Sequence, residues 1–342
     1  MHPLPKGILS AKSPGIHRAC ALTSSYAKRG CAPNNVGHIV VTPASPTIAV
    51  FTKNNTNPAY GAARLGADRT AQRLGARTRH YVPDTPDDID EQLALIDAAL
   101  AQQPDAVALV PVHPTAINAA IRKINTAGVP VMALINRFTD GGCVTFVGSQ
   151  DYPMATGIAT YLIERLRGSG VVAIVEGPRD SITSRERMRG FLDALNKHPG
   201  IRLVATVCGD YQREPARRAM AGLLSSAPRV DGIIAANDIM AMGTIEALDA
   251  AGRKCLIVGI NAIPEAITAI KRGTMLATAD FNAMKMGCLA TEAAIRHLRG
   301  ETLPQEIILP VEIVDRTNCK AWDRPYEQRE CPQWEDAVRN VV

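Results

Sequence analysis

Short apolar runs alternate with longer amphipathic segments along most of the chain after residue 46. The first run, Ile48 to Phe51, is typical of a buried strand, and small apolar residues follow it at helical spacing. The same alternation predicts strands at 48–52, 78–82, 106–112, 129–135, 144–148, 171–176, 202–208, 231–236, 255–260, 275–280 and 307–314. Strands separated by helices favour parallel sheets covered by helices on both faces, an α/β fold.

Signals for the ends of helices fall where this alternation requires them. The run Thr85-Pro86-Asp87-Asp88 is typical of a helix start, because a hydroxyl can accept from free N–H groups and Pro suits the first turn. Asp238 is expected to cap a later helix in the same way. Gly128 and Gly252 lie between a predicted helix and the next strand, where glycine commonly terminates a helix.

The number of predicted strands exceeds what one sheet comfortably holds, so the pattern predicts two similar lobes. We expect the chain to cross between them near residue 148 and again near residue 280. The expected division is an irregular N-terminal extension at 1–46, an N-terminal lobe of 47–148 plus 281–306, a C-terminal lobe of 149–280 plus 307–316, and a tail at 317–342 that packs over the hinge or one lobe. A cleft between hinged lobes is a natural site for a small ligand.

Composition narrows the class of protein without deciding its function. The chain has 342 residues, 46% of them hydrophobic, which is enough for two lobes with real cores. A net charge of +5 spread over scattered basic residues gives little support to nucleic acid as a partner. No run of 18 apolar residues is present, so no membrane span is expected.

Residues 1–46 contain no continuous apolar stretch of the kind found in signal peptides. Either the protein stays in the cytoplasm or the sequence does not begin at its natural start. The eight cysteines include no C-x-x-C pair, which disfavours a zinc site or a thioredoxin-like centre. Cys319 and Cys331 are close in sequence within the tail, and they either form a disulfide or remain free thiols.

One loop carries candidate binding chemistry. Asn57-Pro58-Ala59-Tyr60 lies where the first predicted strand gives way to a helix, and ligands of open α/β sheets sit beyond such strand ends. A ring can stack on the C–H face of a sugar, and amides or guanidinium groups can pair with its hydroxyls. The sequence contains no P-loop, H-E-x-x-H or G-x-S-x-G motif. We therefore expect no enzymatic activity, no cofactor and no metal.

The order of motifs resembles the type I periplasmic solute-binding proteins of sugar ABC transporters, the ribose-binding-protein group. The resemblance covers roughly 47–316. It is carried by Asn57-Pro58-Ala59-Tyr60, GVPVMALINR (128–137), FVGSQD (146–151), SRERMRGF (184–191), AANDIMAMGTIEAL (235–248) and IVGINAIPEAI (257–267). It implies two Rossmann-like lobes with parallel sheets joined by a hinge.

The resemblance also implies which residues contact the ligand. Contacts are expected from Asn57, Tyr60, His113, Asn136, Arg137, Ser149, Arg187, Tyr211, Asn237, Asn261 and Asp280. Asn136 and Asn261 stand where the family often carries Asp, so a polyol, a deoxy sugar or a sugar acid stays open beside an ordinary sugar. From the residues alone, purely structural roles stay open for two of them: His113 could simply cap the next helix, and Tyr60 could belong to the core of the first helix.

By this resemblance the protein is expected to be a monomer in the periplasm. It would capture a sugar-like ligand, hand it to the permease of an ABC transporter and have no nucleic-acid partner. An alternative is the sensing domain of a lactose-repressor-family regulator with a degenerate or missing DNA-binding head, because Arg29-Gly30-Cys31-Ala32-Pro33-Asn34 resembles the joining segment there. Residues 1–28 are too short and too rich in Pro for a full helix-turn-helix head. An enzyme on this fold is the third reading.

Overall fold

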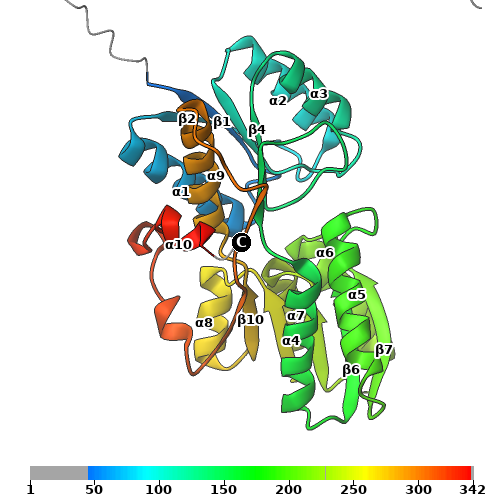
Figure 1. Ribbon diagram of the computed structural model, residues 1–342. Helices are drawn as coiled ribbons and strands as arrows, with labels where there is room; N and C mark the ends of the chain where they lie inside the picture. The colour runs from blue at the N-terminus through cyan, green and yellow to red at the C-terminus, as the bar shows by residue number, and fades with distance from the viewer. Residues whose placement is uncertain (1–44, 228, 340–342) are drawn as a thin grey trace, which may run out of the picture. The chain divides into compact units, whose positions relative to one another are not determined.

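The structure, a computed structural model, describes residues 45–227 and 229–339 (Figure 1). These residues belong to one compact unit, residues 43–342. The expected N-terminal extension lies outside the described residues except for residues 45 and 46, as does the segment Arg29 to Asn34.

The first lobe is built on a sheet with the strand order β11-β5-β4-β3-β1-β2, in which all neighbours are parallel. Its strands are β1 (Thr47–Phe51), β2 (Arg77–Tyr81), β3 (Ala106–Leu109), β4 (Val131–Leu134), β5 (Thr145–Gly148) and β11 (Glu306–Ile308). The helices packed on it are α1 (Pro58–Leu74), α2 (Ile89–Ala101), α3 (Asn118–Thr126) and α9 (Ala283–Leu298). The strand order reverses between β1 and β3, so this sheet has the switch point at which α/β folds bind ligands.

The second lobe repeats this plan with the strand order β12-β10-β9-β8-β6-β7. Its strands are β6 (Gly170–Glu176), β7 (Ile201–Cys208), β8 (Gly232–Ala235), β9 (Leu256–Ile260), β10 (Ala277–Asp280) and β12 (Glu312–Asp315). Its helices are α4 (Asp151–Arg165), α5 (Ile182–Asn196), α6 (Arg213–Ser226), α7 (Asp238–Ala250) and α8 (Pro264–Arg272). Only β12 runs antiparallel to its neighbour, β10.

The strand expected over 307–314 is two strands in two different sheets. β11 pairs with β5 of the first lobe, and β12 pairs with β10 of the second. Pro310 lies between them, and a proline cannot donate to a sheet ladder. Within the described residues the chain therefore passes between the lobes at 149–150, at 281–282 and at 309–311.

Two helix starts differ from their sequence predictions. Helix α2 is capped by Asp88, whose carboxylate accepts from the backbone N–H of Glu91 at 2.8 Å, whereas Thr85 lies outside the helix. Helix α7 is capped by Asn237, which accepts from the N–H of Met240 at 2.8 Å. Asp238 is instead the first helical residue and is fully buried.

Helices α1 and α9 lie side by side in the first lobe and pack unusually closely (Figure 1). A Cβ atom at Gly66 would lie 2.2 Å from the carbonyl oxygen of Met284, and one at Gly287 would lie 2.0 Å from that of Ala63. Both positions therefore require glycine, because any side chain would push the two backbones apart.

The tail runs from the second lobe to the first. It contains the short helices η1 (Cys319–Ala321), η2 (Tyr326–Gln328) and α10 (Trp334–Val338). Near its start η1 contacts α8, and the indole N–H of Trp322 donates to the carboxylate of Asp280 at 2.7 Å. Farther along η2 contacts α1, and the guanidinium of Arg296 on α9 lies 4.8 Å from the ring centre of Trp334. No helix among the described residues is long and apolar enough to span a membrane.

Candidate ligand-binding site

A pocket lies where the carboxyl ends of strands from both sheets meet. It is a small cavity, about 30 Å³, and it is partly open to solvent. It is lined by Lys53, Asn54, Asn57, Tyr60, Asp87, Ile135 and Asn136 of the first lobe, by Thr183, Arg187, Tyr211, Asn237 and Asn261 of the second, and by Phe281 at the second crossing. Side chains from both lobes thus enclose the pocket.

The loop after β1 is held in place by its own amides. The side-chain oxygen of Asn54 accepts from the backbone N–H of Asn57 at 3.0 Å, and its amide donates to the carboxylate of Asp87 at 2.6 Å. Asn57 in turn caps α1, with its side-chain oxygen accepting from the N–H of Ala59 at 3.0 Å. These bonds fix the direction of the Asn57 and Asp87 side chains before any ligand arrives.

Lys53 is a buried cation at the wall of the pocket. It is only 5% exposed, and within residues 45–227 and 229–339 its ammonium group has no hydrogen-bond or ion-pair partner. Burial lowers the pKa of Lys53, although the carboxylates of Asp87 and Asp151 oppose this shift. Because Lys53 lines the pocket and an ammonium group carries three N–H donors, it can donate to an acceptor on a ligand.

Arg187, on α5, is 6% exposed, and only part of its guanidinium group is hydrogen-bonded within the described residues. Its Nε donates to Asp151 at 2.9 Å, and its Nη1 donates to the carbonyl of Ala236 at 2.6 Å. Burial by itself would lower the pKa of Arg187, but the charge and hydrogen bond of Asp151, together with Tyr211 and Tyr60, outweigh it and raise the pKa. A guanidinium has five N–H donors, so the remaining donors of this rigid group are available to a ligand.

Tyr211 lines the pocket, while its hydroxyl is buried within the protein. Its Oη is buried and has no hydrogen-bond partner in the described part of the chain. The ring lies against Gly177, where an added Cβ would come within 2.4 Å of it. Burial raises the pKa of Tyr211 to about 12, and burial likewise raises that of Tyr60. Both phenols therefore stay neutral at physiological pH and can donate as well as accept.

Backbone strain is concentrated at the pocket. Asp87, Ile135, Tyr211 and Asn261 have φ values of 60°, 61°, 56° and 128°. Such values are costly for residues other than glycine, most of all for β-branched Ile135, and they cluster at ligand sites in proteins. The surrounding structure holds these four residues in conformations that aim their groups at the pocket.

Two hydrogen bonds join the lobes across the pocket. The amide of Asn136 donates to the hydroxyl of Thr183, and the amide of Asn261 donates to the side-chain oxygen of Asn57 at 3.4 Å. The second bond is long, and its acceptor already serves Ala59. The two lobes are thus in polar contact through groups that a ligand could engage instead.

The structure brings together seven of the residues expected from sequence. These are Asn57, Tyr60, Asn136, Arg187, Tyr211, Asn237 and Asn261. Part of the hydrogen-bonding capacity of Asn237 is already used, because it caps α7 and also donates to the carbonyl of Tyr211 at 3.3 Å. The other six keep at least one group directed at the cavity or at the opposite lobe.

Four expected residues lie outside the lining of this pocket. His113 accepts through Nδ1 from the N–H groups of Thr115 and Ala116, so it closes a local turn. Asp280 accepts from the indole of Trp322, which covers it. Both side chains are therefore engaged in contacts within the protein, away from the lining of this pocket.

Arg137 and Ser149 line a separate opening at the first crossing. The guanidinium of Arg137 lies 3.8 Å from the ring centre of Phe146 and pairs with Glu306. These contacts hold the Arg137 side chain away from the pocket.

Sequence reasoning missed six lining residues: Lys53, Asn54, Asp87, Ile135, Thr183 and Phe281. Lys53 and Asn54 come directly after the first strand, and their polar character there is a signal that could have found them. Asp87 belongs to the run 85–88, for which the sequence predicts only a helix start. Ile135 and Thr183 carry no such signal, because an apolar residue and a hydroxyl are ordinary at those positions.

Comparison with known proteins settles the family. Residues 48–302 match the profile of a family described as a periplasmic binding protein domain. The chain belongs to this family. The resemblance and the two-lobed α/β fold predicted from sequence are thereby confirmed, and the family consists of solute-binding proteins rather than enzymes.

Among the relatives of this chain are proteins named for the sugars they bind. The ribose import binding protein RbsB of Bacillus subtilis is 27% identical over 267 residues, 78% of this chain and 86% of the relative. The D-ribose/D-allose-binding protein of Pseudomonas aeruginosa is 28% identical over 287 residues, 80% of this chain and 90% of the relative.

A solved structure shows the same architecture. The ABC transporter solute-binding protein of Actinobacillus succinogenes, crystallised with D-allose, superimposes with a TM-score of 0.77. It is 28% identical, and the match covers 81% of this chain and 99% of that one. The similarity therefore extends over both lobes.

Proposed function

We propose that this periplasmic binding protein captures a sugar or sugar-like ligand, such as a polyol or a sugar acid, in the pocket between its lobes. The observation that carries the proposal is the lining itself, in which two tyrosine rings lie among amide, ammonium and guanidinium donors from both lobes. Sugars need this mixture, because a ring can cover their C–H face while charged and amide donors satisfy their hydroxyls. The relatives named for ribose and for allose support the same ligand class.

The proposed contacts come from both lobes. Asn57, Tyr60 and Asn136 would hold the ligand from the first lobe, with Lys53 and Asp87 beside them. From the second lobe we assign Arg187, Tyr211, Asn237 and Asn261. His113, Arg137, Ser149 and Asp280 are not assigned to this pocket.

Binding would act through closure of the lobes. A ligand that accepts from Arg187 and donates to Asp87 would bridge the two lobes and stabilise the closed arrangement over open ones. The inter-lobe bonds of Asn136 and Asn261 would be exchanged for bonds to the ligand at small cost. The closed protein would then deliver its ligand to the permease of an ABC transporter outside the cytoplasm.

A screen of thermal stability tests the binding step. Ribose, allose, other pentoses and hexoses, xylitol, myo-inositol and aldonic acids are added at millimolar concentration to the purified protein. A ligand selective for the native state raises its melting temperature, and at 100 times Kd it stabilises by about 2.7 kcal/mol. The shift should disappear in Arg187→Ala and persist in Arg137→Ala, a matched arginine outside the pocket. Failure of every polyhydroxylated compound would reject the proposal.

Delivery needs its own measurement. Uptake of the radiolabelled ligand identified by the screen is measured in cells that lack this protein and in cells that carry it. Uptake restored by the wild type, but not by Arg187→Ala, supports the transport role. Unchanged uptake would separate binding from transport and leave only the first part of the proposal.

A further inference from the structure

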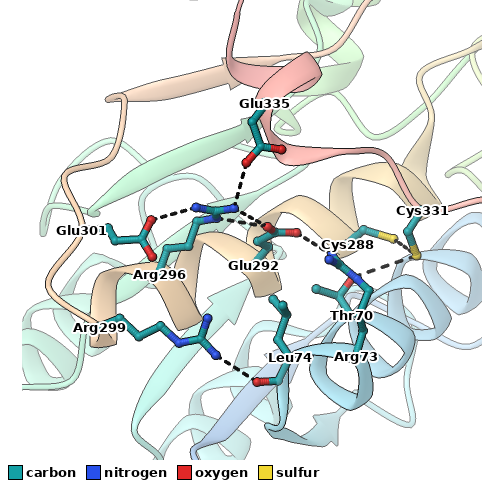
Figure 2. A network of polar contacts seen from close by, with 10 residues as sticks. All are labelled: Thr70, Arg73, Leu74, Cys288, Glu292, Arg296, Arg299, Glu301, Cys331 and Glu335. Atoms are coloured by element: carbon teal, nitrogen blue, oxygen red, sulfur yellow. Dashed lines mark hydrogen bonds and ion pairs between the residues drawn. The ribbon is translucent and has the colours of Figure 1, made fainter.

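Two cysteines from distant parts of the chain meet at the surface of the first lobe (Figure 2). The sulfur of Cys331, in the tail, lies 2.8 Å from the sulfur of Cys288 on α9, although 43 positions separate them. From the sequence, a disulfide between Cys319 and Cys331 is one of two open alternatives, the other being two free thiols. Cys319 instead lies in η1, which contacts α8 of the second lobe.

Ion pairs around the two cysteines hold the tail against helix α9. Arg296 on α9 donates to Glu335 of the tail at 3.3 Å and also pairs with Glu292 at 2.9 Å. Glu292 in turn pairs with Arg73 of α1 at 2.6 Å, so one network joins α1, α9 and α10 (Figure 2). The two sulfurs are therefore kept adjacent by contacts that do not depend on a bond between them.

The two thiols differ in accessibility. Cys288 is 1% exposed, whereas Cys331 is half-buried and borders an open depression shared with Arg69 and Arg73. A hydrogen bond from the Cys288 thiol lowers the pKa of Cys331 to about 6, and the two arginines act in the same direction. Cys331 is thus the sulfur that reacts first, because the thiolate is the nucleophile and an oxidant can reach it.

We propose that Cys288 and Cys331 form a disulfide that fastens the tail to helix α9. The sulfurs need to approach by less than about 1 Å to reach the bonding distance of about 2.05 Å. The oxidant is a disulfide of low molecular weight or of an oxidoreductase. The thiolate of Cys331 attacks one of its sulfurs and expels a thiolate. Cys288, losing its proton, then attacks the sulfur of Cys331 in the mixed disulfide and expels the second thiolate.

The exchange balances without any further reagent. Two thiols are oxidised to one disulfide, and the oxidant's disulfide is reduced to two thiols, which take up the two protons released. Such a bond persists where the surroundings are oxidising, as they are outside the cytoplasm.

The bond would add a covalent link between the lobes. The segment between Cys288 and Cys331 contains β11 of the first sheet, β12 of the second, and the contact of Trp322 with Asp280. After its contacts with the second lobe, the segment comes back to the first lobe, where the disulfide would attach it to α9. The tail then acts as a strap of fixed length, which limits how far the lobes can separate.

Peptide mapping of the unreduced wild-type protein is the direct test. The full chain is incubated with oxidised glutathione, blocked with iodoacetamide, digested and analysed by mass spectrometry without reductant. One cross-linked peptide pair joining Cys288 to Cys331 is expected. Alkylated Cys288 and Cys331 after this treatment, or Cys331 linked to Cys319, would overturn the proposal. This measurement needs no variant and does not depend on the identity of the ligand.

The melting temperature gives a second test with a matched control. Dithiothreitol should lower the melting temperature of the oxidised wild type and of Cys319→Ser by about 5–10 °C, because it removes the constraint on the unfolded chain. It should leave Cys331→Ser and Cys288→Ser unchanged. A drop of the same size in Cys331→Ser would mean that the reductant acts elsewhere, and it would refute the assignment.

Discussion

The side-chain amide of Asn261, on the second lobe, donates to the side-chain oxygen of Asn57, on the first, over 3.4 Å. The backbone of Asn261 is strained, with a φ of 128°, and Asn57 already caps α1 with the same oxygen. A strained donor that reaches across to a shared acceptor contributes little to stability. From its position at the pocket we propose that the amide serves a ligand.

Replacing Asn261 with Ala should therefore separate binding from stability. We expect the melting temperature without ligand to change by no more than a few degrees. The Kd of the ligand should rise about 5- to 100-fold, the loss of a buried hydrogen bond worth about 1–3 kcal/mol. Isothermal titration calorimetry measures the Kd, and Arg137→Ala serves as the control. An unchanged Kd would remove Asn261 from the site.

Tyr211 offers a sharper version of the same test. Its hydroxyl is buried without a well-formed hydrogen bond among the described residues, although the hydroxyl of Ser184 lies close to it, so Tyr211→Phe removes at most a weak internal contact. The free energy of unfolding without ligand should stay the same or rise slightly, because an unsatisfied polar group is lost. Ligand affinity should fall about 5- to 100-fold if the hydroxyl contacts the ligand. Denaturant titration measures the stability, and a loss above about 1 kcal/mol in the unliganded protein would show an internal role.

Lys53 should show a trade-off between stability and binding. Its side chain is 5% exposed beside the pocket, and its ammonium makes no hydrogen bond or ion pair within the described part of the chain. Lys53→Met keeps most of the side-chain volume and removes the charge. The unliganded protein should gain about 1 kcal/mol or more in the free energy of unfolding, while ligand affinity falls at least tenfold.

The control for Lys53→Met is a comparison between ligands. If the ammonium pairs with a carboxylate of the ligand, the loss should be much larger for an aldonic acid than for the matching neutral sugar. Equal losses of affinity for the two ligands would mean that Lys53 binds a hydroxyl of the ligand. A variant that is less stable and binds normally would contradict both readings.

Asp238 should make stability depend on pH. It lies in the core of the second lobe, where its carboxyl accepts from Thr278 at 2.7 Å and from the N–H of Ile263 at 3.1 Å. Burial raises the pKa of Asp238 to about 7, above its value of about 3.9 in an unfolded chain. The native state therefore binds this proton more tightly, so the contribution of Asp238 to stability is greatest below about pH 4 and falls as the pH rises to about 7.

Asp238→Asn isolates this contribution. The variant keeps the shape of the protonated carboxyl but cannot ionise. The difference in free energy of unfolding between variant and wild type should favour the variant increasingly from pH 4 to pH 7 and then level off. Taking the difference cancels other titrating groups. A difference that is independent of pH would show that Asp238 is ionised in the native protein throughout this range.

Much of the fold was predictable because its signals are local. Each buried strand is a short apolar run, and each helix has its own spacing, so the alternation and the two-lobe division follow from residues that are near in sequence. The split of 307–314 between two sheets was not predictable, since an apolar run does not say which edge it joins. Pro310 was the one local sign of the break.

A ligand-contacting residue was predictable only where its place after a strand is enough to turn its side chain towards the pocket. Asn261 follows β9 directly and Asn57 lies in the loop after β1, and both line the pocket. Asp280 ends a strand in the same way, but Trp322, 42 positions later, covers it. The partner of Cys331 was missed for the same reason, because closeness in sequence to Cys319 says nothing about which helix the tail reaches.

The contact between α1 and α9 supplies a prediction about stability alone. A Cβ at Gly66 would lie 2.2 Å from the carbonyl oxygen of Met284, and a backbone atom cannot move aside as a flexible side chain can. Gly66→Ala should therefore lower the free energy of unfolding by about 2–3 kcal/mol or more. Gly61→Ala, in the same helix, is the matched control, since its Cβ would meet only the end of the Arg64 side chain at 3.9 Å. That substitution should stabilise the protein by about 0.5–1 kcal/mol through helix propensity. Denaturant titration of both variants measures the contrast, and similar values for the two would mean that α1 and α9 do not pack this closely.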